Sequence, residues 1–165
     1  MSKFQQLDMI GGQAIDINSS TQQHQLGLCC KAVDMASTDY GVGEFIYAIG
    51  SASTVVGSVV QIDATGYQTD LAVANDKGMI GTAMAATVAG EYGWFQIKGR
   101  GVAKGLASLA DNANCYLTAT DGSIDDAVVV GDRIHNMLTV SALDTPSTGL
   151  AEVDMNYPHC DDIAD

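Results

Sequence analysis

The side chains best suited to acid–base chemistry are three histidines, and they lie far apart in the sequence. His24 is in a polar N-terminal stretch, His135 closely follows Arg133, and His159 is near the C-terminus. A catalytic site needs such a group beside a nucleophile, a second acid or base, or a metal. No recognisable nucleophile motif stands next to any of the three. The sequence therefore predicts a protein that is not an enzyme.

Two further segments contain groups that bind ions in other proteins, but neither has the required spacing. Residues 99–105 (GRGVAKG) combine glycines with a lysine, yet lack the GKS/T ending of a phosphate-binding loop. Residues 121–126 (DGSIDD) bring carboxylates close together, in an order that differs from that of a calcium-binding EF-hand loop. We interpret the first segment as a glycine-bent strand end and the second as a solvated acidic turn. We expect no metal and no cofactor.

Cysteines and the C-terminal tail supply the remaining soft ligands. Cys29, Cys30, Cys115 and Cys160 form neither a CxxC pair nor a zinc-ligand spacing, so we expect buried thiols. Residues 158–162 (PHCDD) place imidazole, thiol and carboxylates together, which could chelate a transition metal when three copies of the chain meet at a symmetry axis. A plain acidic tail is the preferred interpretation.

The charge balance argues against a nucleic-acid partner. Seven Lys and Arg residues stand against 20 Asp and Glu residues, giving a net charge of −13. Such an excess repels a phosphate backbone, and it keeps a protein soluble at high concentration. The N-terminus lacks the apolar run of a signal peptide, and no stretch approaches the roughly 18 apolar residues of a membrane span. We expect synthesis in the cytoplasm and no membrane association.

Short strands are the elements that must position these side chains. Eighteen glycines against two prolines favour many turns, and glycine weakens helices. Residues 44–49 (EFIYAI) and 94–98 (WFQIK) alternate with a period of two, as half-buried strands do. The pattern predicts an all-β fold, a small antiparallel β-barrel or a β-tulip or sandwich, with at most one short helix, over residues 102–112. The expected strands cover residues 26–35, 44–49, 58–62, 69–74, 79–86, 93–98, 114–118, 127–130, 138–142 and 150–155.

The same pattern divides the chain into two parts. Residues 1–25 are polar and predict an extended N-terminal arm, either frayed or lying along a neighbouring subunit as an added strand. Residues 26–165 predict a single β domain with an acidic C-terminal tail. Within this domain, Asp121-Gly122 indicates a hairpin that joins residues 115–118 to 128–130.

The densest aromatic cluster is formed by residues 92–95 (YGWF), and aromatic side chains of this kind anchor either a core or a subunit interface. The arm adds apolar side chains that a partner could cover. Our candidates for contacts with a partner or a second subunit are Phe4, Ile15, Ile17, Tyr92 and Trp94.

The order of motifs in the second half resembles that of a known family. Residues 89–99 (AGEYGWFQIKG) are followed by 114–122 (NCYLTATDG), 124–127 (IDDA), 131–134 (GDRI) and Tyr157-Pro158. This arrangement, over roughly residues 43–158, is similar to that of the head decoration or cement proteins of tailed bacteriophages. No catalytic residue defines that family. The resemblance implies a β-barrel or β-tulip domain, often trimeric, that binds the outside of the mature capsid.

Under this resemblance the chain is a structural virion protein that stabilises the shell by bridging neighbouring capsid subunits. Its partners would be the major capsid protein and further copies of itself in a homotrimer, and it would reside on the capsid exterior after synthesis in the host cytoplasm. One alternative is a receptor-binding, glycan-binding or tail-associated β module, marked by exposed aromatic side chains beside carboxylates in a groove. A small metal-dependent enzyme and a cytosolic barrel of unrelated function are the others.

Overall fold

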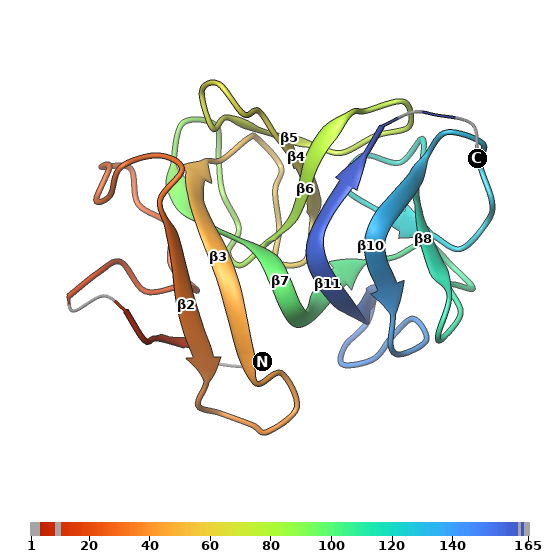
Figure 1. The fold of residues 1–165 in the computed structure, drawn as a ribbon, viewed down its shortest axis with the longest axis horizontal. Coiled ribbons are helices and arrows are strands. Elements are labelled where there is room, and N and C mark those ends of the chain that lie inside the picture. The colour runs from red at the N-terminus through yellow and green to blue at the C-terminus, as the bar shows by residue number, and fades with distance from the viewer. Residues whose placement is uncertain (1–3, 9–10, 162, 164–165) are drawn as a thin grey trace.

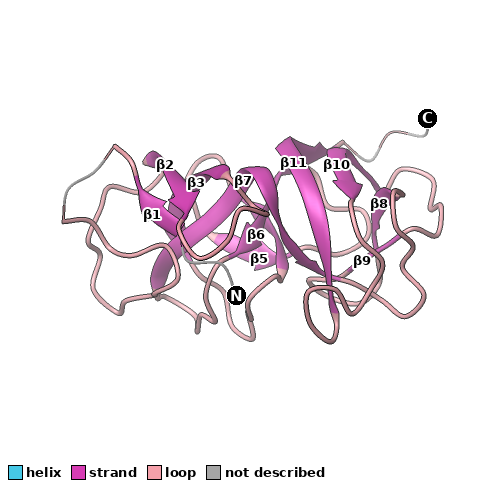
Figure 2. Cartoon of the chain, turned by 90° about the horizontal axis from the view of Figure 1, so that it is seen from below, coloured by secondary structure: helices cyan, strands magenta, loops and turns pink. Residues whose placement is uncertain are grey.

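The computed structural model describes residues 4–8, 11–161 and 163, and every regular element in this part of the chain is a β-strand (Figures 1 and 2). The all-β prediction is confirmed. Within these residues no helix is long and apolar enough to cross a membrane. The strands are β1 (Phe4–Gln6), β2 (Cys29–Asp34), β3 (Val42–Ile49), β4 (Val59–Ile62), β5 (Thr69–Leu71), β6 (Gly78–Ala83), β7 (Tyr92–Lys104), β8 (Asn114–Leu117), β9 (Ile124–Asp125), β10 (Arg133–Thr139) and β11 (Leu150–Cys160).

All the strands belong to one antiparallel sheet. Its order is β1-β2-β3-β7-β6-β11-β10-β8-β9, with β4 paired to β6 and β5 paired to β4. The sheet is not closed into a barrel, so the sandwich or tulip-like form is the predicted architecture that fits.

Strand β7 joins the two halves of the sheet, as Figure 1 shows. Its first part pairs with β3 and its second part with β11. It bends at Gly99, where φ is +93° and an added Cβ would lie 2.7 Å from the carbonyl oxygen of Val42, so only glycine fits. The buried Gln96 donates from Nε2 to the carbonyl oxygens of Lys98 (3.1 Å) and Arg100 (3.0 Å). The side chain of Gln96 therefore provides hydrogen-bond partners for two carbonyl groups at the bend.

Two expectations for the second half differ from the structure. The short helix allowed over residues 102–112 is not formed, because residues up to Lys104 continue β7 in register with β11. The strand expected at residues 127–130 is wrong: these residues form a loop, because β9 and β10 already occupy the two edges of β8. The hairpin turn at Asp121-Gly122 is present, but it pairs Leu117 with Ile124.

The described part of the predicted N-terminal arm lies on its own chain. Strand β1 adds to the edge of β2, so that Phe4 is opposite Asp34. Further along, Ser19 and Tyr92 exchange two backbone hydrogen bonds of 2.9 and 2.8 Å. Residues 1–3 and 9–10 lie outside the described part. The segment thus contributes to the core of its own domain in this structure.

The core consists of three groups of buried side chains. The first half contains an aromatic cluster, which consists of Ile15, Cys30, Ala32, Phe45, Tyr47 and Trp94 with Phe4, Leu26, Met84 and Tyr92 at its edge. The second half contains an aliphatic cluster, which consists of Val59, Ala72, Ile80, Ala103, Leu109, Cys115, Leu117, Ile124, Ile134, Met137, Ala151, Val153, Met155 and Cys160. A smaller group around Phe95 and Ile97 lies with strands β3, β4, β6 and β7.

Candidate functional site

The structure brings four of the five candidate contact residues together, in the aromatic cluster. Ile15 and Trp94 are each 1% exposed, and Phe4 and Tyr92 lie at the cluster's edge. The ring centroid of Phe4 is 4.9 Å from that of Phe45. Ile17 is 54% exposed and does not belong to the cluster. In this conformation the cluster is therefore core, and Ile17 is the candidate with the most exposed side chain.

Gln13 holds the arm segment against this cluster. Its carbonyl oxygen accepts a hydrogen bond from Trp94 Nε1 at 2.9 Å, and its Oε1 accepts one from the Tyr47 hydroxyl at 2.8 Å. Its backbone N–H donates to His24 Nε2 at 3.0 Å, which requires an unprotonated nitrogen at that position. Buried Tyr and Trp side chains need such partners for their polar atoms. Our sequence reasoning missed Gln13, and a glutamine within a Gln-rich stretch gives no signal of this role.

The other two histidines lie side by side at the opposite end of the molecule. The rings of His135 on β10 and His159 on β11 are stacked with centroids 5.2 Å apart, and Asp161 lies 3.5 Å from His135 Nε2. Within the described residues, no group of three or more His, Cys, Asp or Glu side chains is arranged to hold a metal ion. His24 lies in the aromatic cluster and does not join this pair.

Three of the four cysteines are buried thiols, as expected, whereas Cys29 is exposed. Burial raises the pKa of Cys30, Cys115 and Cys160 to about 12 in each case. Because the thiolate is the nucleophile and the metal ligand, these protonated thiols are unreactive at neutral pH.

The loop at residues 128–130, which we call the three-valine loop, exposes consecutive apolar side chains. Val128, Val129 and Val130 are 75%, 44% and 72% exposed. The base of the loop is anchored, because the buried Asp132 accepts a hydrogen bond from Asn75 N at 2.6 Å and its own N–H donates to Val129 O at 3.2 Å. Sequence reasoning assigned these valines to a strand. Their lack of alternation was a signal against a half-buried strand.

A groove of about 380 Å³ lies over the outer face of β7 and β11. This size is at the lower end of the range of ligand pockets, about 300–1,000 Å³. Loop residues 36–40 and 146–147 and the arm at 15–16 form its walls. The groove is lined by Phe4, Ile15, Asp16, Ala36, Ser37, Asp39, Tyr40, Val56, Met84, Val102, Pro146, Ser147, Leu150 and Glu152.

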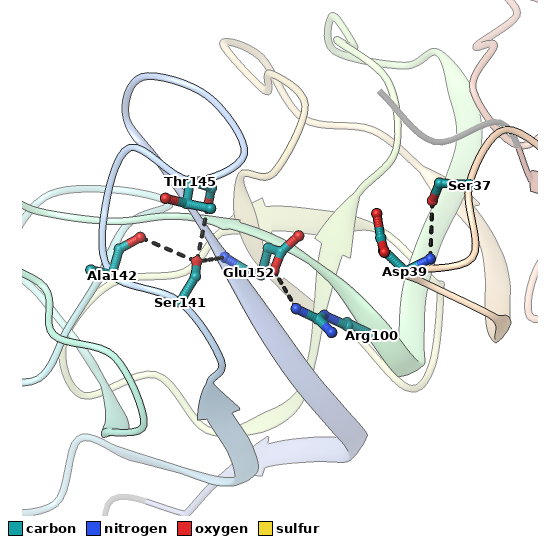
Figure 3. A network of polar contacts seen from close by, with 7 residues as sticks. All are labelled: Ser37, Asp39, Arg100, Ser141, Ala142, Thr145 and Glu152. Atoms are coloured by element: carbon teal, nitrogen blue, oxygen red, sulfur yellow. Dashed lines mark hydrogen bonds and ion pairs between the residues drawn. The ribbon is translucent and has the colours of Figure 1, made fainter.

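A polar network fixes the floor of this groove (Figure 3). Arg100 Nη2 lies 2.5 Å from Glu152 Oε2, and the N–H of Glu152 donates to Ser141 Oγ at 2.9 Å. Burial and a hydrogen bond to Glu152 hold the pKa of Tyr40 above its usual range, so its hydroxyl stays protonated. The hydrogen bond with Glu152 also raises the pKa of Arg100. Sequence reasoning did not predict this network, because its members are far apart in the chain.

A row of charged side chains crosses the sheet on β2, β3 and β7. Lys31 pairs with Glu44, and Glu44 with Lys98, in the strand register. Glu44 Oε1 lies 3.9 Å from Lys31 Nζ and 3.4 Å from Lys98 Nζ, and the Tyr157 hydroxyl donates to Oε2. The Tyr157 hydrogen bond, followed by the two lysines, lowers the pKa of Glu44. The row places opposite charges next to one another across three strands, and such cross-strand pairs stabilise the sheet.

Two surfaces can thus meet other molecules: the three-valine loop, which is exposed and apolar, and the groove, whose lining is mixed. They differ in what they offer, because the loop presents only apolar side chains and the groove adds carboxylates and a tyrosine hydroxyl. No known protein family, curated protein or solved structure matches the chain.

Proposed function

We propose that the chain is a structural virion protein that binds the outside of a tailed-phage capsid and stabilises the mature shell by bridging neighbouring capsid subunits. The motif order over roughly residues 43–158, which resembles that of head decoration proteins, first suggested this role. The all-β fold is compatible with it. The proposal includes a homotrimer as the binding form.

The observation that carries the proposal is the three-valine loop. Exposed contiguous apolar surface marks protein–protein contacts in soluble proteins. The loop is held outward by the hydrogen bonds of Asp132 at its base, so its exposure is a built feature of the domain. It therefore suits docking against another protein surface.

Trimerisation would multiply a modest affinity. Linked copies that bind together raise the effective affinity without any new contact, provided that the geometry allows simultaneous binding. The net charge of −13 would keep free copies apart and soluble until the shell presents its sites.

The test is co-sedimentation of the purified chain with expanded phage shells that lack it, and with unexpanded precursor shells. We expect saturable binding to expanded shells, in multiples of three copies. Replacing Val128 and Val130 together by serine should abolish this binding. Val88→Ser is the matched control, because Val88 is also an exposed loop valine but lies outside the three-valine loop.

Three results would count against the proposal. A folded chain that binds no shell excludes the capsid role. Binding of the serine double variant that equals that of the unmodified chain removes the three-valine loop as the contact. A monomer at working concentration, measured by analytical ultracentrifugation, excludes the trimer.

A receptor- or glycan-binding module is the second candidate function. The observation in its favour is that Tyr40 lies beside Asp39 and Glu152 in the groove, which is the arrangement of an aromatic side chain and carboxylates expected for sugar recognition. A glycan array probed with the chain and with the Tyr40→Ala variant tests it. Binding that is lost in the variant would support this function, and no binding would exclude it for the glycans on the array.

A further inference from the structure

Apolar side chains form much of the lining of the groove over β7 and β11. Val102 and Leu150 come from these two strands, and Ile15 and Met84 add apolar side chains from the arm and from the residue after β6. Apolar side chains outnumber polar ones in its lining. Burying one large apolar side chain here removes apolar surface of both partners from water, which is the main source of binding free energy at such sites.

Every charged side chain that lines the groove is acidic. Asp16 and Asp39 are exposed at the rim, and Glu152 is buried at the floor. The guanidinium of Arg100 is already bound to Glu152, so this cation offsets the charge at the floor and leaves the rim negative. The rim therefore attracts a cation that arrives with an apolar side chain.

Hydrogen bonds within the chain hold both the floor and part of the rim in place. Ser141 accepts the backbone N–H of Glu152, Arg100 holds the carboxylate, and the Ser37 hydroxyl accepts the N–H of Asp39 at 3.2 Å (Figure 3). A site whose side chains are fixed before binding loses little conformational entropy when it is occupied.

We propose that this groove binds an extended segment of a partner protein, which inserts one large apolar side chain and flanks it with lysine or arginine. A second copy of the chain is a poor occupant, because its exposed apolar loop follows the partly exposed Asp125 and Asp126 and would bring their carboxylates toward an acidic rim. A sugar is less favoured, since Tyr40 and the edge of Phe4 are the aromatic groups in a mostly apolar lining. The inference does not rest on the capsid role.

The test is a titration of the full-length, ¹⁵N-labelled chain with acetyl-Lys-Leu-Lys-amide, followed by two-dimensional NMR. This method detects millimolar affinities, so a short generic peptide is sufficient. We expect the largest shifts at the backbone amides of Tyr40, Val102 and Glu152. Acetyl-Lys-Ser-Lys-amide should bind about tenfold more weakly, because it lacks the apolar side chain. Acetyl-Glu-Leu-Glu-amide should bind about threefold or more weakly at low salt, because its charges oppose the rim.

Matched variants locate the site. Val102→Thr puts a hydroxyl group into the groove and should weaken binding several-fold, whereas Val42→Thr, on an exposed strand position outside the groove, should leave it unchanged. Asp16→Asn with Asp39→Asn should weaken binding about twofold to fivefold. Asp70→Asn, which removes an exposed carboxylate outside the groove, is the charge control. Each spectrum also reports whether the variant is folded, and the three peptides on the unmodified chain decide the question if a variant is not.

Three outcomes overturn the inference. The first is that Lys-Leu-Lys causes no shifts at the groove. The second is that Lys-Ser-Lys or Glu-Leu-Glu shifts the groove amides equally well. Either result would show that one of the two features, the apolar side chain or the flanking positive charges, is not needed for binding. The third is that a neutral oligosaccharide, such as cellotetraose, shifts these amides and the peptide does not, which assigns the groove to sugars.

Discussion

The two halves of the molecule that β7 joins bury their side chains in different ways. The aromatic cluster uses a few large rings, and the polar atoms of Tyr47 and Trp94 find their partners in the N-terminal segment, at Gln13 and, for the Tyr47 hydroxyl, also at the N–H of Gln23. The aliphatic cluster uses many smaller side chains, mostly aliphatic ones with Met and Cys among them. The first half therefore depends on a distant segment for its hydrogen bonds, and the second depends mainly on close packing.

The surfaces of the two halves also differ, in the charge and polarity of the side chains that they expose. On the aromatic side, the row Lys31–Glu44–Lys98 covers the sheet with paired charges. On the aliphatic side, the three-valine loop leaves apolar side chains in solvent. The charged row thus covers part of the first half with solvated side chains, whereas the three-valine loop gives the second half a contiguous apolar surface.

The largest expected effect comes from removing the ring that links the aromatic cluster to the arm. Trp94→Ala should lower the free energy of unfolding by about 3–5 kcal/mol, because it leaves a cavity and removes the Nε1 hydrogen bond to Gln13. Urea unfolding followed by circular dichroism measures the loss.

Met137→Ala in the aliphatic cluster is the control, with an expected loss of about 2–5 kcal/mol. The two variants should differ in hydrogen exchange: only Trp94→Ala should speed exchange at residues 13–24 under native conditions. Equal exchange at this segment in the two variants would contradict the dependence of the arm on the aromatic cluster.

A smaller effect is expected at the bend that connects the halves. Gly99→Ala should destabilise by about 2–3 kcal/mol, because it combines a positive φ with a Cβ placed 2.7 Å from the Val42 carbonyl oxygen. Thermal unfolding by calorimetry is the measurement.

Gly90→Ala separates the two causes. Gly90 also has a positive φ, +84°, but nothing lies within 4 Å of its added Cβ. It should cost only about 1–2 kcal/mol, the penalty of the left-handed conformation itself. If Gly99→Ala and Gly90→Ala lower the free energy of unfolding by the same amount, close packing at Gly99 does not contribute to the stability of the bend.

Residues 44–49 and 94–98 were correctly predicted as strands, and they form β3 and the first part of β7. The expectation that only one face is buried was wrong, because residues 45–48 and 94–97 are all buried. Phe45 and Tyr47 belong to the aromatic cluster, and Ile46 and Ala48, which point to the opposite face, belong to the group around Phe95 and Ile97. The extension of β7 to Lys104 was missed, since Gly99 and Gly101 interrupt the pattern and the bend depends on Gln96 reaching carbonyl groups further along the strand. The strand predicted at residues 127–130 was wrong for the opposite reason. Three valines have strand propensity, but propensity does not reveal that both edges of β8 are already occupied.

The candidate surfaces were less predictable than the fold. The sequence indicated that Trp94 and Tyr92 are important, and it cannot say whether a ring faces its own arm or a partner. The groove is assembled from the arm, a β2–β3 loop, β7 and β11, which only the tertiary structure brings together. Local patterns hold no information on such long-range contacts.

A still smaller effect is expected in the charged row, and it depends on pH. The folded-state pKa of Glu44 is lowered, so its contribution to stability is present above the unfolded pKa, about 4.3, and is lost as pH falls through the folded value. Glu44→Gln should therefore cost at most about 1 kcal/mol at neutral pH, and the difference from the unmodified chain should shrink toward about pH 3. Urea unfolding at a series of pH values measures it.

A double-mutant cycle with Lys98→Met isolates the pair, since Lys98 Nζ lies 3.4 Å from Glu44 Oε1. The coupling should weaken with added salt and disappear at the acidic end of the series. A difference between Glu44→Gln and the unmodified chain that stays constant from neutral to acidic pH would show that the carboxylate charge is not the cause.

The smallest effect on stability is expected at the three-valine loop, and its smallness is informative. Val128→Ser should change the free energy of unfolding by no more than about 0.5 kcal/mol, because an exposed side chain buries little apolar surface in the folded state. Ile124→Ala, a few residues earlier but fully buried, should cost about 2–5 kcal/mol in the same urea titration. If Val128→Ser proved comparably destabilising, the loop would be part of the fold of its own chain, and its valines would not be free for a partner. A change in the free energy of unfolding near zero would show that the valine side chains do not stabilise the single chain, so that their apolar character has an effect only in contact with another molecule.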